Sequence, residues 1–191
     1  EKEPEYGKYL QKAEKASQAK GFVLPYGDSP FDDEPVGETV YMDILNRAKK
    51  YVHIMTPYLI IDQSMITALT FAAKRGVDVK LILPHIPDKK FVFALAKSHY
   101  KELLKAGGRV YTPGFVHAKI FTSDDEKAVV GTINLDYRSL YLHFECAAFL
   151  YQVEEIAEIE KDFQRTLEKC QEVTLENRKK GTFFLRLEGW L

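Results

Sequence analysis

Two short apolar runs, each ended by a proline, constrain the fold of this chain more than any other feature. Residues 51–56 are stopped by Pro57 and residues 77–83 are closed by Pro84, so each run predicts a buried strand. Between them, apolar residues recur at the spacing of a helix that ends before Gly76. Strand, helix and strand in this order predict a crossover unit with parallel strands.

The rest of the chain continues the alternation of predicted helices and strands, and near residue 116 this pattern changes. Helical spacing marks residues 40–48, 91–106 and 153–170, and extended runs occupy 109–111 and 142–151. These patterns predict an α/β fold with a mixed, largely parallel β-sheet sandwiched between helices. Functional groups in such folds lie beyond the carboxyl ends of the strands.

A hairpin is predicted where the pattern changes. The apolar runs Val116–Thr122 and Lys127–Gly131 are separated by Ser123, two aspartates and a glutamate, which are turn residues. If the chain turns at Asp124 and Asp125, residues whose numbers add up to 249 lie opposite each other, as Thr132 and His117 do.

Length and charge limit the function classes. A chain of 191 residues with 46% hydrophobic content forms one core, so we expect residues 1–20 to be a connector and 21–191 a single domain. With 27 basic and 28 acidic residues the chain has no global field for a polyanion, which argues against a nucleic-acid partner.

The predicted hairpin carries an unusual motif. The sequence reads His117-Ala118-Lys119, then Asp124, then Gly131-Thr132-Ile133-Asn134, a combination with a chance probability of about 10⁻⁵ at this length. In a strand His117 and Lys119 would point to one face. Imidazole, ammonium, hydroxyl and amide are donors suited to the oxygens of a phosphodiester.

A lone histidine on a strand is usually a hydrogen-bonded core residue, and here the correlated spacing favours a functional one. Three further residues each allow two interpretations. His85, after a predicted strand, lines the site or is a turn residue, and Tyr58 lines the pocket or packs. Arg138 binds a second phosphate or pairs with an acidic neighbour.

The motif resembles that of the phospholipase D superfamily. Further segments resemble the C-terminal half of bacterial cardiolipin synthases, and the likeness runs from about Gly21 to the C-terminus. These segments are residues 131–140, residues 143–145, Pro25-Tyr26-Gly27-Asp28-Ser29-Pro30 and Thr56-Pro57-Tyr58-Leu59.

The resemblance implies a phosphatidyltransferase that joins two phosphatidylglycerol molecules into cardiolipin and glycerol, through a phosphohistidine, without metal or cofactor. It makes His117 a catalytic histidine, and it makes Lys119 and Asn134 phosphate ligands. Thr132 takes the Ser/Thr position of the family's site. Glu145 matches the acidic residue that orients the imidazole, and Asp124 ties the turn of the motif in place.

The chain departs from the family in carrying one motif where the site needs two. His53, His85, His99 and His143 lack a lysine two residues on. Either an N-terminal half or a second copy supplies the other histidine, and His117 would then serve as general acid. Two rival interpretations remain, a homodimeric single-motif phosphodiesterase or nuclease and an inert phosphate-binding half.

The resemblance also implies a place at the bacterial cell membrane and a membrane surface as partner of the complete protein. No stretch of this chain is as long and apolar as a membrane-spanning helix, so we expect the piece itself to be soluble.

Overall fold

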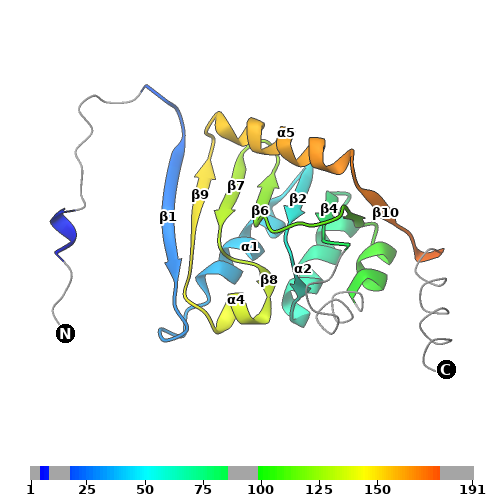
Figure 1. Cartoon of the computed structure of the whole chain (residues 1–191), viewed down its shortest axis with the longest axis horizontal. Helices are drawn as coiled ribbons and strands as arrows, with labels where there is room; N and C mark the ends of the chain where they lie inside the picture. Colours follow the sequence, from blue (N-terminus) through cyan, green and yellow to red (C-terminus); the bar gives the residue numbers. More distant parts are fainter. Residues whose placement is uncertain (1–4, 9–17, 86–98, 177–191) are drawn as a thin grey trace.

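An eight-stranded sheet forms the centre of the molecule (Figure 1). The structure, a computed structural model, describes residues 5–8, 18–85 and 99–176. The strand order is β1-β9-β7-β6-β2-β4-β5-β10. The strands are β1 (Phe22–Asp28), β2 (Tyr51–Met55), β4 (Asp78–Ile82), β5 (Arg109–Thr112), β6 (Ile120–Ser123), β7 (Lys127–Gly131), β9 (Glu145–Tyr151) and β10 (Gln171–Val173).

The sheet is mixed, and the expectation that it is largely parallel was wrong. β4 lies parallel to β2, and β5 lies parallel to β4. The remaining neighbours, from β1 to β2 and between β5 and β10, run antiparallel. Helical crossovers join the parallel strands, whereas β6 and β7 are joined by a hairpin, which reverses the chain direction.

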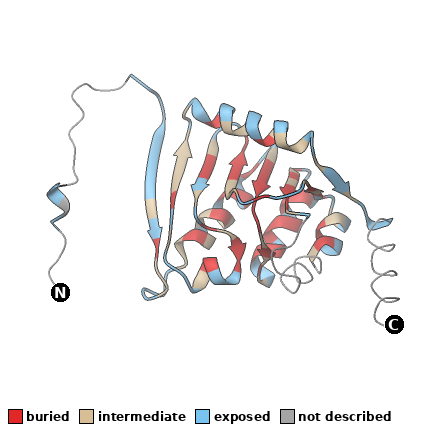
Figure 2. Cartoon of the chain, in the orientation of Figure 1, coloured by how far each residue is buried: buried red, intermediate tan, exposed pale blue. Residues whose placement is uncertain are grey.

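Helices cover both faces of the sheet, as predicted. They are α1 (Val36–Arg47), α2 (Gln63–Lys74), residues 99–105, α4 (Tyr137–Tyr141) and α5 (Glu155–Leu167), and η1 (Tyr6–Lys8) precedes the sheet. Side chains alternate along β2, so that Val52 and Ile54 pack in the larger core with α1 and α2. Met55 packs with Phe163 of α5 on the opposite face. Buried residues gather in the middle strands, and the edge strand β1 is mostly exposed (Figure 2).

The hairpin differs from its prediction in register. Ile120 lies opposite Val130 and Ser123 opposite Lys127, so that opposite residues add up to 250 and not to 249. The loop therefore has three residues, and Asp124 and Asp125 adopt φ angles of 58° and 61°. β6 also begins only at Ile120, three residues after His117.

Asp124 fixes this turn to the rest of the domain. One carboxylate oxygen accepts hydrogen bonds from the backbone N–H groups of Lys50 (2.8 Å) and Tyr51 (2.9 Å), and the other accepts one from Lys49 (2.8 Å). Burial opposes ionisation of Asp124, but these three donors hold the pKa of its carboxyl below the usual value. The contacts agree with a turn-fixing role for Asp124.

Two predictions fall partly outside the described residues. Of the expected connector 1–20 only residues 5–8 and 18–20 are described, and of the expected helix 91–106 only residues 99–105 are described as helical. None of the described helices is long and apolar enough to cross a membrane.

Candidate active site

A second, two-stranded sheet joins the segment after β2 to the segment after β7. β3 (Leu59–Ile60) lies parallel to β8 (Leu135–Asp136). The Thr56 hydroxyl donates to the carbonyl of Tyr58 at 3.2 Å and accepts the N–H of Leu135 at 3.2 Å. The two segments singled out in the sequence therefore meet at one end of the large sheet.

A buried carboxylate is the centre of the polar groups at this end. Glu145 is the first residue of β9, and its side chain is only 8% exposed. One oxygen accepts the hydroxyl of Ser139 at 2.9 Å, and the other accepts the hydroxyl of Thr132. The Asn134 amide nitrogen also donates to Ser139, at 3.0 Å. These contacts satisfy a carboxylate that would otherwise be costly to bury.

The short helix α4 sets the position of Ser139. Asp136 precedes the helix as its N-cap, and its carboxylate accepts the backbone N–H of Ser139 at 2.9 Å. The aspartate and the serine are spaced as an N-cap pair, but neither was assigned a role from the sequence. Only the partners of the serine hydroxyl, Asn134 and Glu145, reveal its function in the site.

Lys119 lies within electrostatic reach of the same group. Partial burial lowers the pKa of Lys119, and the negative charges of Glu145 and Asp136 oppose that shift. Its ammonium donates to the backbone carbonyl of His117 at 2.7 Å. The lysine thus adds a positive charge beside two carboxylates at the end of the sheet.

His117 is exposed in the segment before β6, and its ring stacks on Phe115 with centroids 6.1 Å apart. The predicted pairing of Thr132 with His117 was wrong, because the three-residue turn shifts the register by one residue. Thr132 instead bonds the backbone of Cys146 on β9, donating its N–H at 2.9 Å and accepting the Cys146 N–H at 3.0 Å.

Glu145 does not make the contact that the family resemblance implies. Its hydrogen bonds go to Thr132 and Ser139 rather than to the imidazole of His117. The imidazole beside it is that of His143, whose Nδ1 lies 3.7 Å from a Glu145 oxygen. The orienting role of Glu145 toward His117 therefore stays a prediction.

A cavity of about 310 Å³ opens beside this carboxylate. Its lining residues are Tyr58, Ile60, Asn134, Asp136, Arg138, Ser139, His143 and Glu145. Tyr58 and Arg138 therefore lie where the site-lining interpretation puts them. The backbone N–H of His85 bonds the carbonyls of Pro113 (3.1 Å) and Gly114 (3.0 Å), and His85 is not among the residues that line this cavity, so its site-lining role stays a prediction.

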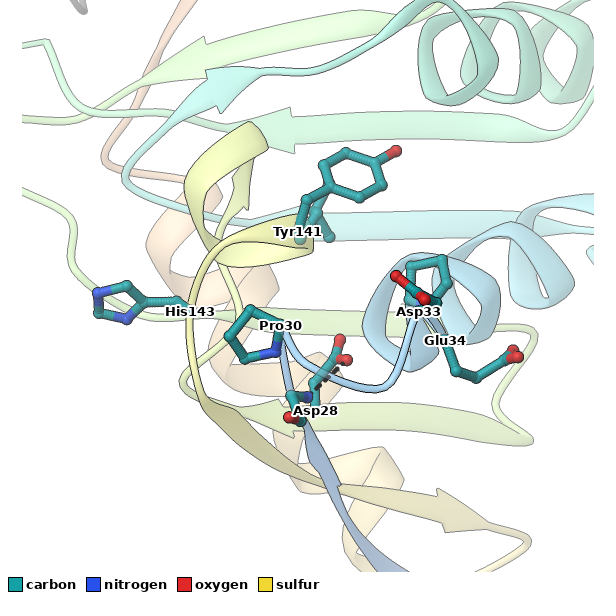
Figure 3. A pocket seen from close by; sticks show the side chains of 9 residues that line it. Asp28, Pro30, Asp33, Glu34, Tyr141 and His143 are labelled. Carbon is teal, nitrogen blue, oxygen red and sulfur yellow. Dashed lines mark hydrogen bonds between the residues drawn. The ribbon is translucent and has the colours of Figure 1, made fainter.

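A second cavity has a volume of about 230 Å³ (Figure 3). The loop after β1 contributes most of its lining, which is Asp28, Ser29, Pro30, Asp33, Glu34, Pro35, Leu140, Tyr141 and His143. His143 is the residue that the two linings share. In residues 5–8, 18–85 and 99–176, no three His, Cys, Asp or Glu side chains are grouped as metal ligands would be.

Comparison with known proteins assigns the chain to a family. The sequence profile of the cardiolipin synthase, phospholipase D-like domain matches residues 41–167, which is more than half of the chain. The chain belongs to this family. The matched range contains the whole motif, from His117 to Glu145.

Relatives of the family are longer than this chain. An uncharacterised protein of Streptococcus mutans is 56% identical over 98% of this chain and 41% of its own length. A cardiolipin synthase of Halalkalibacterium halodurans is 35% identical over 94% of this chain and 36% of its own length. The chain thus spans about two fifths of the relatives that it matches.

Solved structures share the fold. Nuc of Salmonella typhimurium, a phospholipase D family member, superposes with a TM-score of 0.68 at 17% identity, over 81% of this chain and 99% of its own. Phosphatidylserine synthase of Haemophilus influenzae superposes with a TM-score of 0.65 at 17% identity, over 87% of this chain and 46% of its own.

Proposed function

We propose that this chain is one half of a phosphatidyltransferase site that joins two phosphatidylglycerol molecules into cardiolipin and glycerol. The proposal is supported by the relatives named cardiolipin synthase, by the cavity that Asn134 and Glu145 line, and by Lys119, which interacts electrostatically with Glu145. A second His-Lys-Asp motif, from an N-terminal half or from a second copy, supplies the other histidine. The membrane surface is a partner of the complete protein, because both substrates are membrane lipids.

The reaction has two displacement steps at one phosphorus. In the first, the imidazole of the second motif attacks the donor phosphorus, a P–N bond forms and the P–O bond to glycerol breaks. His117 protonates the departing glycerol oxygen. In the second, the terminal hydroxyl of the other phosphatidylglycerol gives its proton to His117 and attacks the phosphohistidine, so that a P–O bond forms and the P–N bond breaks.

Lys119 and Asn134 bind the non-bridging oxygens of the reacting phosphate. The amide nitrogen of Asn134 carries two N–H groups, and Ser139 accepts one of them. Donors held in place in this way stabilise the charge that develops in the transition state by several kcal/mol, about 3 per donor. Thr132 and Ser139 keep the Glu145 carboxylate in place.

His117→Asn in the complete two-motif protein tests the proposal. The change removes the proton donor and keeps a polar side chain on an exposed residue, so cardiolipin formation from phosphatidylglycerol should fall by more than about 100-fold. His99→Asn, a histidine in the helix 99–105, is the control and should keep activity. Retained turnover in His117→Asn would exclude a central acid–base role.

A second candidate is a homodimeric single-motif phosphodiesterase. It is favoured by the superposition of 81% of this chain on 99% of the Nuc chain, which gives the two chains a similar extent. Gel filtration and a DNA-cleavage assay of the 191-residue chain separate the two. We expect the isolated chain to bind phosphate without catalysis, whereas a dimer that cuts DNA would exclude the lipid reaction.

A further inference from the structure

Three groups, from α4, β9 and the loop between them, form a chain of contacts in the lining of the larger cavity. The guanidinium of Arg138, in α4, lies 3.0 Å from Nε2 of His143, and Nδ1 of His143 lies 3.7 Å from a carboxylate oxygen of Glu145. All three residues line the 310 Å³ cavity. The contacts join an exposed cation to a buried carboxylate through an imidazole.

Hydrogen-bond chemistry determines which nitrogen carries the proton in this arrangement. A guanidinium has only donors, so Nε2 of His143 accepts from Arg138 and carries no proton. The ring is then neutral with its proton on Nδ1, the nitrogen that faces Glu145. The imidazole thus accepts a hydrogen bond from the guanidinium and holds it at the cavity, while its other nitrogen lies 3.7 Å from Glu145, too far for a hydrogen bond.

Within residues 5–8, 18–85 and 99–176, no carboxylate pairs with Arg138, and its partner, the imidazole of His143, accepts a hydrogen bond but has no negative charge. Glu145, the carboxylate nearest to the imidazole, has its two oxygens bonded to Thr132 and Ser139. The imidazole of His143 points away from Asp33 and Glu34 of the second cavity (Figure 3). Asp136, the other carboxylate in the lining of the larger cavity, accepts the backbone N–H of Ser139 as the N-cap of α4. Arg138 is therefore a fixed cation at an exposed place.

The proposed reaction needs two phosphates in the site, and this inference rests on that reaction. In that reaction Lys119 and Asn134 bind the reacting phosphate. The attacking lipid presents the hydroxyl at one end of its glycerol headgroup, and its own phosphate follows at the other end. That phosphate is a non-reacting monoanion, and only the three carbons of glycerol separate it from the hydroxyl. We therefore expect it near the groups that share a cavity with Asn134, and Arg138 is one of them.

We propose that Arg138 binds the non-reacting phosphate of the acceptor lipid, and that His143 is the positioning residue that holds Arg138 for it. Arg138 then selects a phospholipid alcohol over small neutral alcohols. A guanidinium is suited to this task because its donors match two phosphate oxygens at once. Substitution of His143 leaves the guanidinium without its acceptor and so weakens the selection, although His143 touches no substrate.

The test measures how one intermediate divides between two acceptors. The complete two-motif protein receives phosphatidylglycerol in mixed micelles together with isotope-labelled glycerol. The phosphohistidine yields cardiolipin when a lipid is the acceptor. It yields labelled phosphatidylglycerol when the labelled glycerol is the acceptor. The ratio of the two products reports acceptor selection, and it does not depend on how fast the intermediate forms.

Arg138→Ala and His143→Ala should each shift this ratio about tenfold toward labelled phosphatidylglycerol, the size of one lost charge-assisted contact. His143→Gln should restore most of the ratio, because its amide oxygen accepts from a guanidinium. Arg165→Ala is the control, since Arg165 is an exposed arginine in α5 that pairs with Asp162 at 3.4 Å. Its ratio should equal that of the unchanged protein.

An unchanged ratio in Arg138→Ala and His143→Ala, with both products still formed, would overturn the inference and leave the proposed function standing. An equal fall of both products would also overturn it, because His143 would then only support the fold. If the unchanged protein forms neither product, the proposed function fails, and the inference fails with it.

Discussion

Asp124→Asn isolates the hydrogen bonds that fix the hairpin turn. Asparagine tolerates the positive φ of 58° at this position, so the substitution adds no backbone strain. The carboxylate has three backbone donors, two on one oxygen and one on the other. An amide has one acceptor oxygen, and its NH₂ group must face at least one backbone N–H in either orientation.

The loss follows from these contacts. One charge-assisted hydrogen bond disappears, which costs about 1.5–3 kcal/mol, and the remaining bonds lose their charge and weaken. We expect the free energy of unfolding to fall by about 2–4 kcal/mol, which corresponds to a decrease of about 5–15 °C in Tm for a chain of this length.

Urea unfolding followed by circular dichroism measures the difference at several pH values. The pKa of Asp124 is lowered in the folded protein, so its contribution is present above the unfolded pKa near 3.8 and is lost as the pH falls through the folded pKa. The difference between the two proteins should therefore shrink below about pH 4.

Asp125→Asn is the matched control. Asp125 is the next residue, also has a positive φ (61°) and is exposed. In the part of the chain that the structure describes, its hydrogen bonds go only to the hydroxyl of Tyr51. Its substitution should cost less than about 1 kcal/mol. Equal losses in the two variants, or a loss in Asp124→Asn that is the same at pH 3 and pH 7, would refute the reasoning.

Two further predictions concern other carboxylate networks. Glu160 of α5 accepts a hydrogen bond from Thr122 (2.7 Å) and bonds His53 (2.7 Å). Burial opposes the ionisation of Glu160, but these partners lower its pKa. Glu160→Gln should therefore lower the free energy of unfolding in urea by about 2–4 kcal/mol at pH 7 and by less in acid. An equal cost at both pH values would contradict this. Thr132→Val removes the hydroxyl that donates to Glu145 and should lower cardiolipin formation about tenfold or more, whereas Thr132→Ser, which keeps the donor, should stay within about threefold of the unchanged protein. Equal activity of the two variants would exclude a role for the hydroxyl.

The strands that hydrophobic patterning predicts best are those buried on both faces. β2 and β4 appear within one or two residues of their predicted bounds, because each is a short, mostly apolar run ended near a proline. The edge strand β1 was not predicted, since it contains Pro25 and is exposed over most of its length. Three elements are too short to show a hydrophobic periodicity in the sequence, namely β3, β8 and α4. Contacts with distant residues such as Thr56 hold this region in place.

The candidate site was predictable in composition but not in contacts. The motif indicated Lys119, Asn134, Thr132 and Glu145, and the last three share one hydrogen-bonded network in the structure. The hairpin register was wrong because the length of the turn depends on a tertiary contact, the binding of the Asp124 carboxylate to backbone groups of residues 49–51. No local pattern around residue 124 contains that information.

The spacing of the motif now has a structural reason. β6 occupies the four residues between Lys119 and Asp124, so the lysine immediately precedes the strand and the aspartate immediately follows it. Asp124 fixes one end of a strand about 13 Å long, and the other end leads to Lys119 and His117. Because a slip of one residue turns every side chain of a strand to the opposite face, an aspartate at the far end of β6 controls which way the lysine points at the site. Loss of the Asp124 contacts should therefore reduce phosphate binding by Lys119 as well as stability, although the two residues lie at opposite ends of the strand.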